Sequence, residues 1–421
     1  MREDMDFELP VHIGFDALGA FRAFVRRHEL QHLCFVADDN TWEALGARAE
    51  AAMNGGEVAT DIVILHGQEV IADGDYILQV LVPKLPRDCV YVAVGSGTLT
   101  DITRFVSHRT GRRFISLPTA PSVDAFASMN SPLIVQGFKQ TVSAHLPMAI
   151  FADLETLCAA PADMIAAGFG DILGKYTCLA DWRLAHLLWD APYDARAARL
   201  TREGLERVAD HAGAIGRRKP QAIKLLMEAL IASGLSMVQV GSSRPASGSE
   251  HHLSHFWEMQ LLLQERSPIL HGAKVGVGAV LMAREYERIR GMRREEAIRR
   301  LRKREMPDKE QQKEEMKEAY GPLAGKVVEN HSTFLDMLPQ RLETLCEAIV
   351  EHWTEIQEIA ATVPPPDTLR RLLREAGGPT NPCDLDLSPD QVSMALKVAH
   401  YIRSRFTVRK LEMALGLEPL R

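Results

Sequence analysis

Short apolar segments alternate with segments of helical periodicity through the first third of the chain. The apolar segments are "HLCFVAD" (His32–Asp38), "TDIVILHG" (Thr60–Gly67), "CVYVAVGSG" (Cys89–Gly97) and "RFISLPT" (Arg113–Thr119). Between the first three, apolar residues recur at three- and four-residue intervals over Trp42–Met53 and Val70–Lys84. Apolar strands separated by helices indicate a parallel sheet that is covered on both faces. The sequence therefore predicts an N-terminal α/β domain.

The periodicity changes after the fourth apolar segment. "SPLIVQGFKQT" (Ser131–Thr141) predicts a hairpin that turns near Gly137. Beyond "AIFADLETL" the strand pattern almost disappears, and from about Pro161 apolar residues follow helical spacing with glycine and proline at the breaks. We therefore expect two domains, an α/β domain at residues 1–157 and an all-helical domain at residues 158–421.

The expected helical domain contains a dense mixed-charge segment and a proline-rich break. Arg284–Glu318 predicts a pair of solvent-exposed helices stabilised by ion pairs within each helix, and a binding tail is the alternative. "VPPPD" (Val363–Asp367) predicts an interruption before further helices.

Size, charge and cysteine content narrow the classes of function. A chain of 421 residues exceeds the usual size of one core, which agrees with two domains. The formal net charge of -7 argues against nucleic acid or an anionic membrane as a partner. No CxxC pair occurs, "MREDMDFELP" lacks a signal region, and no segment reaches the roughly 20 apolar residues of a membrane span. We expect a cytoplasmic protein with neither a nucleic-acid nor a membrane partner.

The glycine turn Gly95–Ser96–Gly97 follows a predicted buried strand and precedes a predicted helix with Asp101 near its start. Backbone N–H groups at such a helix start can bind a phosphate, and glycine lets the anion approach the main chain. The spacing is not GxGxxG, so a tight strand-to-helix turn without a ligand is the alternative.

A loop rich in short hydroxyl side chains follows the fourth apolar segment. "LPTAPSVDAFAS" carries Thr119, Ser122 and Ser128, with the carboxylate of Asp124 among them. Loops at the carboxyl ends of parallel strands are where α/β proteins bind cofactors. A hydroxyl-rich turn with a helix N-cap is the alternative.

The segment "AAGFGDILGKYTCLADW" contributes the first of several metal-ligand side chains. It predicts a helix that begins after Gly168 and Gly170, with Asp171 in its first turn and Lys175 one turn later on the same face. A surface ion pair between Asp171 and Lys175 is the alternative reading of that spacing.

Histidines at helical spacing complete the candidate metal site. "SGSEHHLSHFWE" places His251 and His255 four residues apart on one helix face, and "ILHGAKVGVGAV" places His271 before another helix. The carboxylate of Asp171 with the neutral imidazoles of His251 and His271 would bind a divalent first-row ion and leave an open position. The alternative is that His271 is an ordinary residue at the end of a helix and binds no metal.

In their order along the chain, these motifs resemble those of the sn-glycerol-1-phosphate dehydrogenases. The motifs are "GSG", "PTAPSVDAFAS", "AGFGDILGKYTCLADW", "SGSEHHLSHFWE" and "HGAKVGVG", and the similarity runs from about Val11 to "YIRSRFTVRKLEMALG". That family belongs to the superfamily of iron-type alcohol dehydrogenases, glycerol dehydrogenase and dehydroquinate synthase. The resemblance implies a dehydroquinate synthase-like fold, with a dinucleotide-binding first domain and a second domain that binds metal and substrate.

The resemblance also implies a role for each motif. Asp171, His251 and His271 would bind one divalent ion (Zn, Ni or Fe), which would act as a Lewis acid on the substrate oxygen. Asp124, Asp171 and His255 would bind substrate, with Asp171 and His255 as catalytic residues. His252 points off that helix face, so we expect a structural role for it. The residues implied for NAD or NADP are Gly95, Ser96, Gly97, Thr98, Leu99, Thr119, Ser122 and Ser128.

The reaction implied by the resemblance is the reversible reduction of dihydroxyacetone phosphate to sn-glycerol 1-phosphate in a homodimer. Asp38 and Asp39 favour NAD, because carboxylates suit a ribose hydroxyl and repel a 2′-phosphate. The family usually has three glycines where this chain has Gly95–Ser96–Gly97. It also usually has a glycine after the substrate aspartate, where this chain has Ala125 followed by Phe126. The alternatives are a dehydroquinate synthase-like cyclase, a polyol or glycerol dehydrogenase acting on an unphosphorylated substrate, and a non-catalytic nucleotide-binding protein.

Overall fold

A parallel sheet of six strands lies at the centre of the N-terminal part of the chain. The computed structural model describes residues 9–53, 58–67, 69–135, 138–304 and 307–420. Within these residues the strand order of the sheet is β1-β8-β5-β4-β2-β3, and every neighbouring pair is parallel. The strands are β1 (Val11–Gly14), β2 (His32–Asp38), β3 (Ala59–Leu65), β4 (Val90–Val94), β5 (Phe114–Leu117) and β8 (Ile150–Asp153). The predicted α/β domain is confirmed.

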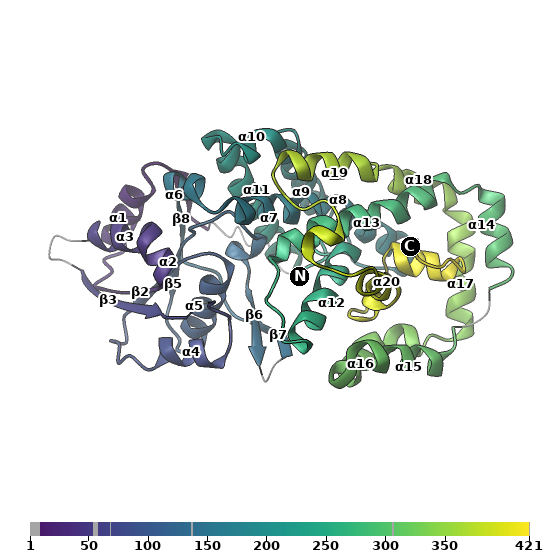
Figure 1. Ribbon diagram of the computed structural model, residues 1–421, viewed down its shortest axis with the longest axis horizontal. Helices are drawn as coiled ribbons and strands as arrows, with labels where there is room; N and C mark the ends of the chain where they lie inside the picture. The colour runs from purple at the N-terminus through teal and green to yellow at the C-terminus, as the bar shows by residue number, and fades with distance from the viewer. Residues whose placement is uncertain (1–8, 54–57, 68, 136–137, 305–306, 421) are drawn as a thin grey trace. The chain divides into compact units, whose positions relative to one another are not determined.

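Helices cover both faces of this sheet. Leu33, Phe35 and Ala37 of β2 face one core, which α1 (Ala17–Arg27) and α3 (Ala47–Ala51) complete. The alternate residues of β2 face a second core, to which α4 (Gly74–Leu81) and α5 (Gly97–Arg109) contribute. Figure 1 shows the first helix pair on one side of the strands and the second pair on the other. Because both of their faces are buried, the inner strands β2 and β4 are almost continuously apolar rather than alternating.

Most predicted segments overlap an observed strand or helix. β2 has the predicted bounds, and β3, β4 and β5 overlap their predicted segments. β1 was not predicted, because this short edge strand has no buried residue and so no buried apolar run. The helix predicted over Val70–Lys84 begins only at Gly74, where the side chain of Asp73 accepts hydrogen bonds from the first backbone N–H groups.

The structure shows how two further predicted segments fold. The helix predicted over Trp42–Met53 consists of a π-helical segment at Trp42–Gly46 and α3, and α2 (Asp39–Thr41) precedes it. The predicted hairpin is confirmed, since β6 (Asn130–Val135) pairs antiparallel with β7 (Phe138–Ser143). Its turn near Gly137 lies outside the described residues.

The chain divides into two compact units, which differ from the predicted division after residue 157. The first unit extends to Gly168 and includes 214–238, and the second comprises 169–213 and 239–421. The segment 214–238 joins the first unit because Ser233 donates a hydrogen bond to Asp124 and Gly234 lies against the backbone carbonyl of Asp124. The remaining helices of the first unit, some of which cross its boundaries, are α6 (Leu154–Ala159), α7 (Ala162–Leu173), α10 (Ala212–Gly216) and α11 (Pro220–Val240).

The helix α11 is long and apolar enough to cross a membrane, judged by length and composition alone. This corrects the expectation that no segment reaches that length. In the structure, 56% of its most apolar window is buried. A core helix of a soluble protein has the same length and composition, so α11 is weak evidence for a membrane span.

Helices make up the regular structure of the second unit in the part of the chain that is described. They are α8 (Lys175–Trp189), α9 (Ala195–Ala209), α12 (Ser249–Leu263), α13 (His271–Gly291), α14 (Arg294–Leu301), α15 (Lys309–Tyr320), α16 (Ala324–Leu335), α17 (Pro339–Glu351), α18 (Trp353–Ala361), α19 (Pro366–Glu375), α20 (Pro389–Val398) and α21 (Val408–Ala414). The mixed-charge segment forms the end of α13, α14 and most of α15, with ion pairs inside these helices such as Arg300 to Glu296. The proline-rich break separates α18 from α19.

Candidate metal and nucleotide sites

Asp171 lies in the last turn of α7 and not, as predicted, in the first turn of a helix. Gly168 and Gly170 are inside α7, so neither glycine starts it. A Cβ at position 170 would lie 2.3 Å from the carbonyl oxygen of Gly272. The glycine is therefore required by the close approach of α7 to α13, and that approach brings Asp171 beside the start of α13.

The structure brings Asp171, His251 and His271 together, and we call them the Asp-His-His group. One ligand atom from each lies within 4.8 Å of the others. His251 Nε2 is 3.6 Å from Asp171 Oδ1, and the ring centroids of His251 and His271 are 5.2 Å apart. The three side chains come from α7, α12 and α13 of the second unit.

Glu250 holds the ring of His251 in one orientation. Its carboxylate lies 2.7 Å from His251 Nδ1 and accepts hydrogen bonds from Thr177 Oγ1 and the Gly248 backbone N–H. With Nδ1–H donated to Glu250, Nε2 is the atom that faces Asp171. A carboxylate behind a ligating histidine is a usual arrangement at metal sites. No sequence pattern singles out Glu250, because a first-turn glutamate is ordinary in a helix.

Burial and neighbouring charges act on each member of the Asp-His-His group. Burial lowers the pKa of His251, but the carboxylates of Asp171 and Glu250 outweigh it and raise that pKa. Burial raises the pKa of Asp171, but Lys175 and the two histidines outweigh it and hold that pKa well below its usual value. Burial lowers the pKa of His271 well below its usual value, so this imidazole is neutral. A carboxylate and imidazole nitrogens are donors that divalent first-row ions accept. The residues present therefore fit such an ion.

Lys175 is buried and lies within the same network. It donates hydrogen bonds to Asp171 Oδ1 at 3.1 Å and to the Ala246 carbonyl at 3.0 Å. The alternative of a surface ion pair is wrong, because both side chains are fully buried. A carboxylate has two oxygens, so Lys175 and an ion can both contact Asp171.

A second group of ligand side chains, His255, Glu258 and His271, shares one member with the first. All three are only partly buried, and Lys274 Nζ lies 3.8 Å from Glu258 Oε1. In the Asp-His-His group, by contrast, Asp171 and His251 are buried. The more buried Asp-His-His group is therefore the stronger candidate for an ion, and the side chain of His255 is 25% exposed.

His252 lies off the face that carries His251 and His255, in agreement with the predicted helix phase. Its side chain is buried, and neither ring nitrogen has a hydrogen-bond partner among the described residues. Burial lowers its pKa well below the usual value, as do the positive charges of Arg405 and Arg403. His252 is therefore a neutral residue of the protein interior.

In the first unit, the glycine turn connects β4 to the start of α5. Gly95 and Ser96 precede the helix, and Gly97 is its first residue. Gly95 N–H donates to the Leu117 carbonyl and Thr119 N–H donates to the Gly95 carbonyl, so this turn is tied to the hydroxyl-rich loop. The backbone N–H groups at the start of α5, from Gly97 to Leu99, belong to the first turn of a helix, where such groups have no acceptor within the helix and can bind a phosphate.

The predicted hydroxyl side chains have different partners. The Ser122 hydroxyl is hydrogen-bonded to that of Ser96, next to the glycine turn. The Ser128 hydroxyl bonds to the backbone of Asn130, as in the alternative of a hydroxyl-rich turn. Thr119 is buried. Asp124 accepts a hydrogen bond from Ser233 at 2.8 Å and is 8% exposed.

Arg104 is a residue of this loop network that the sequence did not reveal. It lies on α5 and is fully buried. Its guanidinium donates to Asp101 Oδ1 at 2.7 Å and to the carbonyls of Ala125, Phe126 and Asn130. Arg104 thus fixes the backbone that follows Asp124, the predicted substrate-binding residue.

Asp38 and Asp39, the two aspartates at the end of β2, already make contacts within the protein. Asp38 caps α2 by accepting a hydrogen bond from the Thr41 backbone N–H at 2.7 Å. Asp39 lies 3.1 Å from His66 Nδ1 on the surface. The preference for NAD that these carboxylates suggested stays a prediction.

Comparison with known proteins gives consistent results. A family model described as iron-containing alcohol dehydrogenase matches residues 12–161. A glycerol-1-phosphate dehydrogenase (NAD(P)+) of Geobacillus stearothermophilus is 36% identical over 411 residues, which cover 96% of this chain and 92% of the relative. One from Bacillus licheniformis is 41% identical over 402 residues, which cover 94% and 86%. The structure of glycerol dehydrogenase from Schizosaccharomyces pombe has the same fold, with a TM-score of 0.62 at 15% identity over 97% of this chain and 88% of that one.

Proposed function

The chain belongs to the glycerol-1-phosphate dehydrogenases of the iron-containing alcohol dehydrogenase family, and from this membership we propose that it reversibly reduces dihydroxyacetone phosphate to sn-glycerol 1-phosphate with NAD(P)H. The observation that supports this most is the convergence of Asp171, His251 and His271 within 4.8 Å. A non-catalytic nucleotide-binding protein would have no use for that group.

The Asp-His-His group would hold one divalent ion, Zn, Ni or Fe, in the second unit. Bound cofactors supply two kinds of chemistry, Lewis-acid polarisation of the substrate oxygen by the ion and hydride by the reduced nicotinamide. Glu250 would orient the ring of His251 for such an ion, and Lys175 balances the charge of Asp171. The role we propose for these two residues is to position the metal ligands.

Side chains of the protein would orient the substrate and move its proton. Asp171 would contact the substrate as well as the ion, and Asp124, held by Ser233, would accept a hydrogen bond from a substrate hydroxyl. An imidazole exchanges protons near neutral pH, so His255 is the residue expected to exchange the proton of the substrate oxygen. Ala125 and Phe126 follow Asp124 where the family usually has a glycine, and they add bulk beside the proposed substrate position. Experiment must therefore decide between phosphorylated and unphosphorylated substrates.

The nucleotide would bind to the first unit. Residues Gly95 to Leu99 would hold its phosphates at the start of α5, and Thr119, Ser122 and Ser128 would contact the nicotinamide half. We expect NAD to be preferred over NADP, and we expect a homodimer in the cytoplasm.

A spectrophotometric assay tests the proposed function. Purified protein should oxidise NADH when dihydroxyacetone phosphate is added, and the rate should rise with added Zn, Ni or Fe after chelator treatment. Faster turnover of unphosphorylated dihydroxyacetone would instead favour a polyol dehydrogenase. A cyclase of the dehydroquinate synthase type transfers hydride internally, so absence of net NADH oxidation with both ketones would point to it.

Gly97→Val is expected to weaken nucleotide binding. A Cβ at position 97 would lie 3.1 Å from Val123 Cγ2, and the larger side chain would also stand where an anion approaches the helix start. We expect the KM for NADH to rise about tenfold or more. The control is Gly74→Val, at the first residue of α4, where a Cβ would meet nothing within 4 Å. Equal KM values for NADH in both variants would contradict this assignment.

Glu250→Gln is expected to weaken metal binding. The change removes the negative charge behind His251, and loss of such a partner lowers metal affinity about 10- to 100-fold. Competition with a chromophoric chelator measures the affinity, and thermal unfolding checks the fold. Glu258→Gln is the matched variant. If it weakens metal binding more than Glu250→Gln does, the ion is held by the group of His255, Glu258 and His271 instead.

A further inference from the structure

Three arginines of the second unit, Arg244, Arg403 and Arg405, form a cluster of positive charge, which we call the arginine cluster. Arg405 donates hydrogen bonds to the Ser247 carbonyl at 2.6 Å and to Ser243 Oγ at 2.7 Å. Among the described residues, none of the three guanidinium groups has a carboxylate within ion-pair distance.

The charges in this cluster are close enough to repel one another. Burial lowers the pKa of Arg405 to about 10, and the positive charges of Arg403 and Arg244 add to that lowering. Glu250 acts in the opposite sense, but its carboxylate already accepts hydrogen bonds from Thr177 and Gly248. Among the described residues, the cluster therefore has no carboxylate in ion-pair contact with it.

Two of the arginines have unused donors. Arg403 is exposed and Arg244 is half-buried. Neither guanidinium has a hydrogen-bond acceptor in the part of the chain that the structure describes, whereas Arg405 uses its donors to hold the loop between α11 and α12. A guanidinium presents a fork of N–H donors that matches phosphate oxygens and keeps its charge at every physiological pH.

The arginine cluster is tied to the Asp-His-His group through the loop that carries Arg244. Cys178 Sγ donates to the Arg244 carbonyl at 3.2 Å, and Lys175, which contacts Asp171, donates to the Ala246 carbonyl. Ser247, held by Arg405, precedes α12 by two residues, and α12 carries His251. The loop thus links the arginine cluster to the proposed metal ligands within one unit.

We propose that Arg244 and Arg403, with Arg405 holding their loop, bind the phosphate group of the substrate. This inference rests on the proposed function, because it assigns the phosphate of a phosphorylated ketone to these side chains. A phosphate monoester carries up to two negative charges near neutral pH, and the cluster offers positive charge with donors in a forked geometry.

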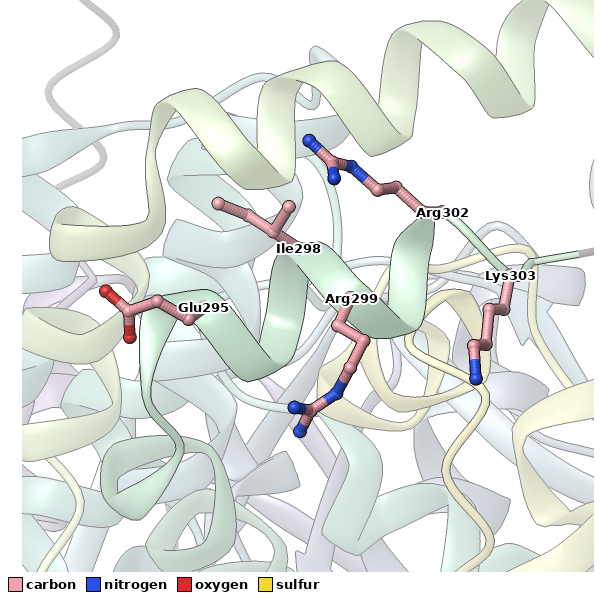
Figure 2. A pocket seen from close by; sticks show the side chains of 5 residues that line it. All are labelled: Glu295, Ile298, Arg299, Arg302 and Lys303. Atoms are coloured by element: carbon pink, nitrogen blue, oxygen red, sulfur yellow. The ribbon is translucent and has the colours of Figure 1, made fainter.

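Another pair of arginines in the second unit, Arg299 and Arg302, is exposed and does not converge on one point, so it supplies a control. Arg299 and Arg302 project from the exposed helix α14, where they line a shallow recess with Glu295, Ile298 and Lys303. Figure 2 shows the side chains of Arg299 and Arg302 on opposite sides of the helix in this view, so they do not converge. Arg299→Met therefore removes an exposed arginine without touching the arginine cluster.

The test compares two ketones that differ only in the phosphate group. For the wild type, Arg244→Met, Arg403→Met and Arg299→Met, kcat/KM is measured with dihydroxyacetone phosphate and with dihydroxyacetone. We expect the ratio of the two values to fall at least about tenfold in Arg244→Met and Arg403→Met. Arg299→Met should keep the wild-type ratio. A wild-type ratio in both cluster variants would overturn the proposal.

A binding measurement separates this proposal from the proposed function. Titration calorimetry with inorganic phosphate should show binding to the wild type and to Arg299→Met, and markedly weaker binding to Arg403→Met, with Arg403→Lys in between. If the wild type does not reduce dihydroxyacetone phosphate, the proposed function fails, but this comparison still tests the arginines. Equal phosphate binding in wild type and Arg403→Met would overturn the inference whatever the enzyme activity.

Discussion

Replacement of His271 by alanine is expected to abolish metal binding and to lower kcat by at least about 10³-fold. His271 is the neutral imidazole of the Asp-His-His group, and burial keeps its pKa well below the usual value. Its removal leaves two protein ligands, Asp171 and His251, where an open catalytic site needs three. The fold should persist, because the ring lies at the first residue of α13 and is only partly buried.

Metal content and turnover, measured on the same preparation, check this prediction. Elemental analysis after dialysis should give close to one ion per chain in the wild type and none in His271→Ala. His252→Ala is the matched control, because that ring is one residue from a ligand yet has no role in the group, and it should keep its ion. Full wild-type turnover after exhaustive chelation would contradict a metal-dependent reaction.

Arg104→Met is expected to lower the free energy of unfolding by about 3–5 kcal/mol. The guanidinium is fully buried, and it donates to Asp101 and to three backbone carbonyls between Ala125 and Asn130. Methionine has a similar length but no donor, so the carboxylate of Asp101 would lose its ion pair inside the protein. The loop that carries Asp124 would lose three of its hydrogen bonds.

Denaturant unfolding of wild type and Arg104→Met gives the difference in stability. Arg109→Met on the same helix is the control, because Arg109 is exposed and such surface changes usually stay within about 0.5 kcal/mol. We also expect a higher KM for the ketone in Arg104→Met, since the positioning of Asp124 depends on this loop. A loss below about 1 kcal/mol would show that the buried arginine is not essential to the loop.

Local patterns in the sequence were sufficient for the parallel sheet and for the helix faces that carry the ligands. A strand buried on both faces must be apolar along its length, and this made β2 recognisable with its observed bounds. Residues four apart on a helix must share a face, so the spacing of His251 and His255 alone places them together. Residue types and spacing also suggested Asp171 and His271 as companions of His251, and the resemblance to a family then gave each of these side chains its role.

Other features depended on contacts between distant segments, which no local pattern reveals. A glycine in a sequence suggests a helix boundary, but Gly170 lies inside α7. A glycine is needed there because the backbone at Gly272 comes too close for a side chain. The roles of Arg104, Glu250 and Arg405 come from hydrogen-bond partners that packing brings to them. Most charged side chains are exposed to solvent, and the residues next to them in the sequence do not show which few will be buried or what those few will contact.

The sequence by itself determined the class of fold, the helix phase of the histidines and, through the resemblance, the family. These follow from the fixed periods of strands and helices and from motifs that lie within short segments. Only the tertiary structure decided which glutamate orients His251, which arginine anchors the loop of Asp124, and which arginines stand together without a carboxylate. Each of those outcomes depends on the packing of elements that are far apart in the chain, because burial removes water and leaves a charged group dependent on whichever partner the fold places beside it.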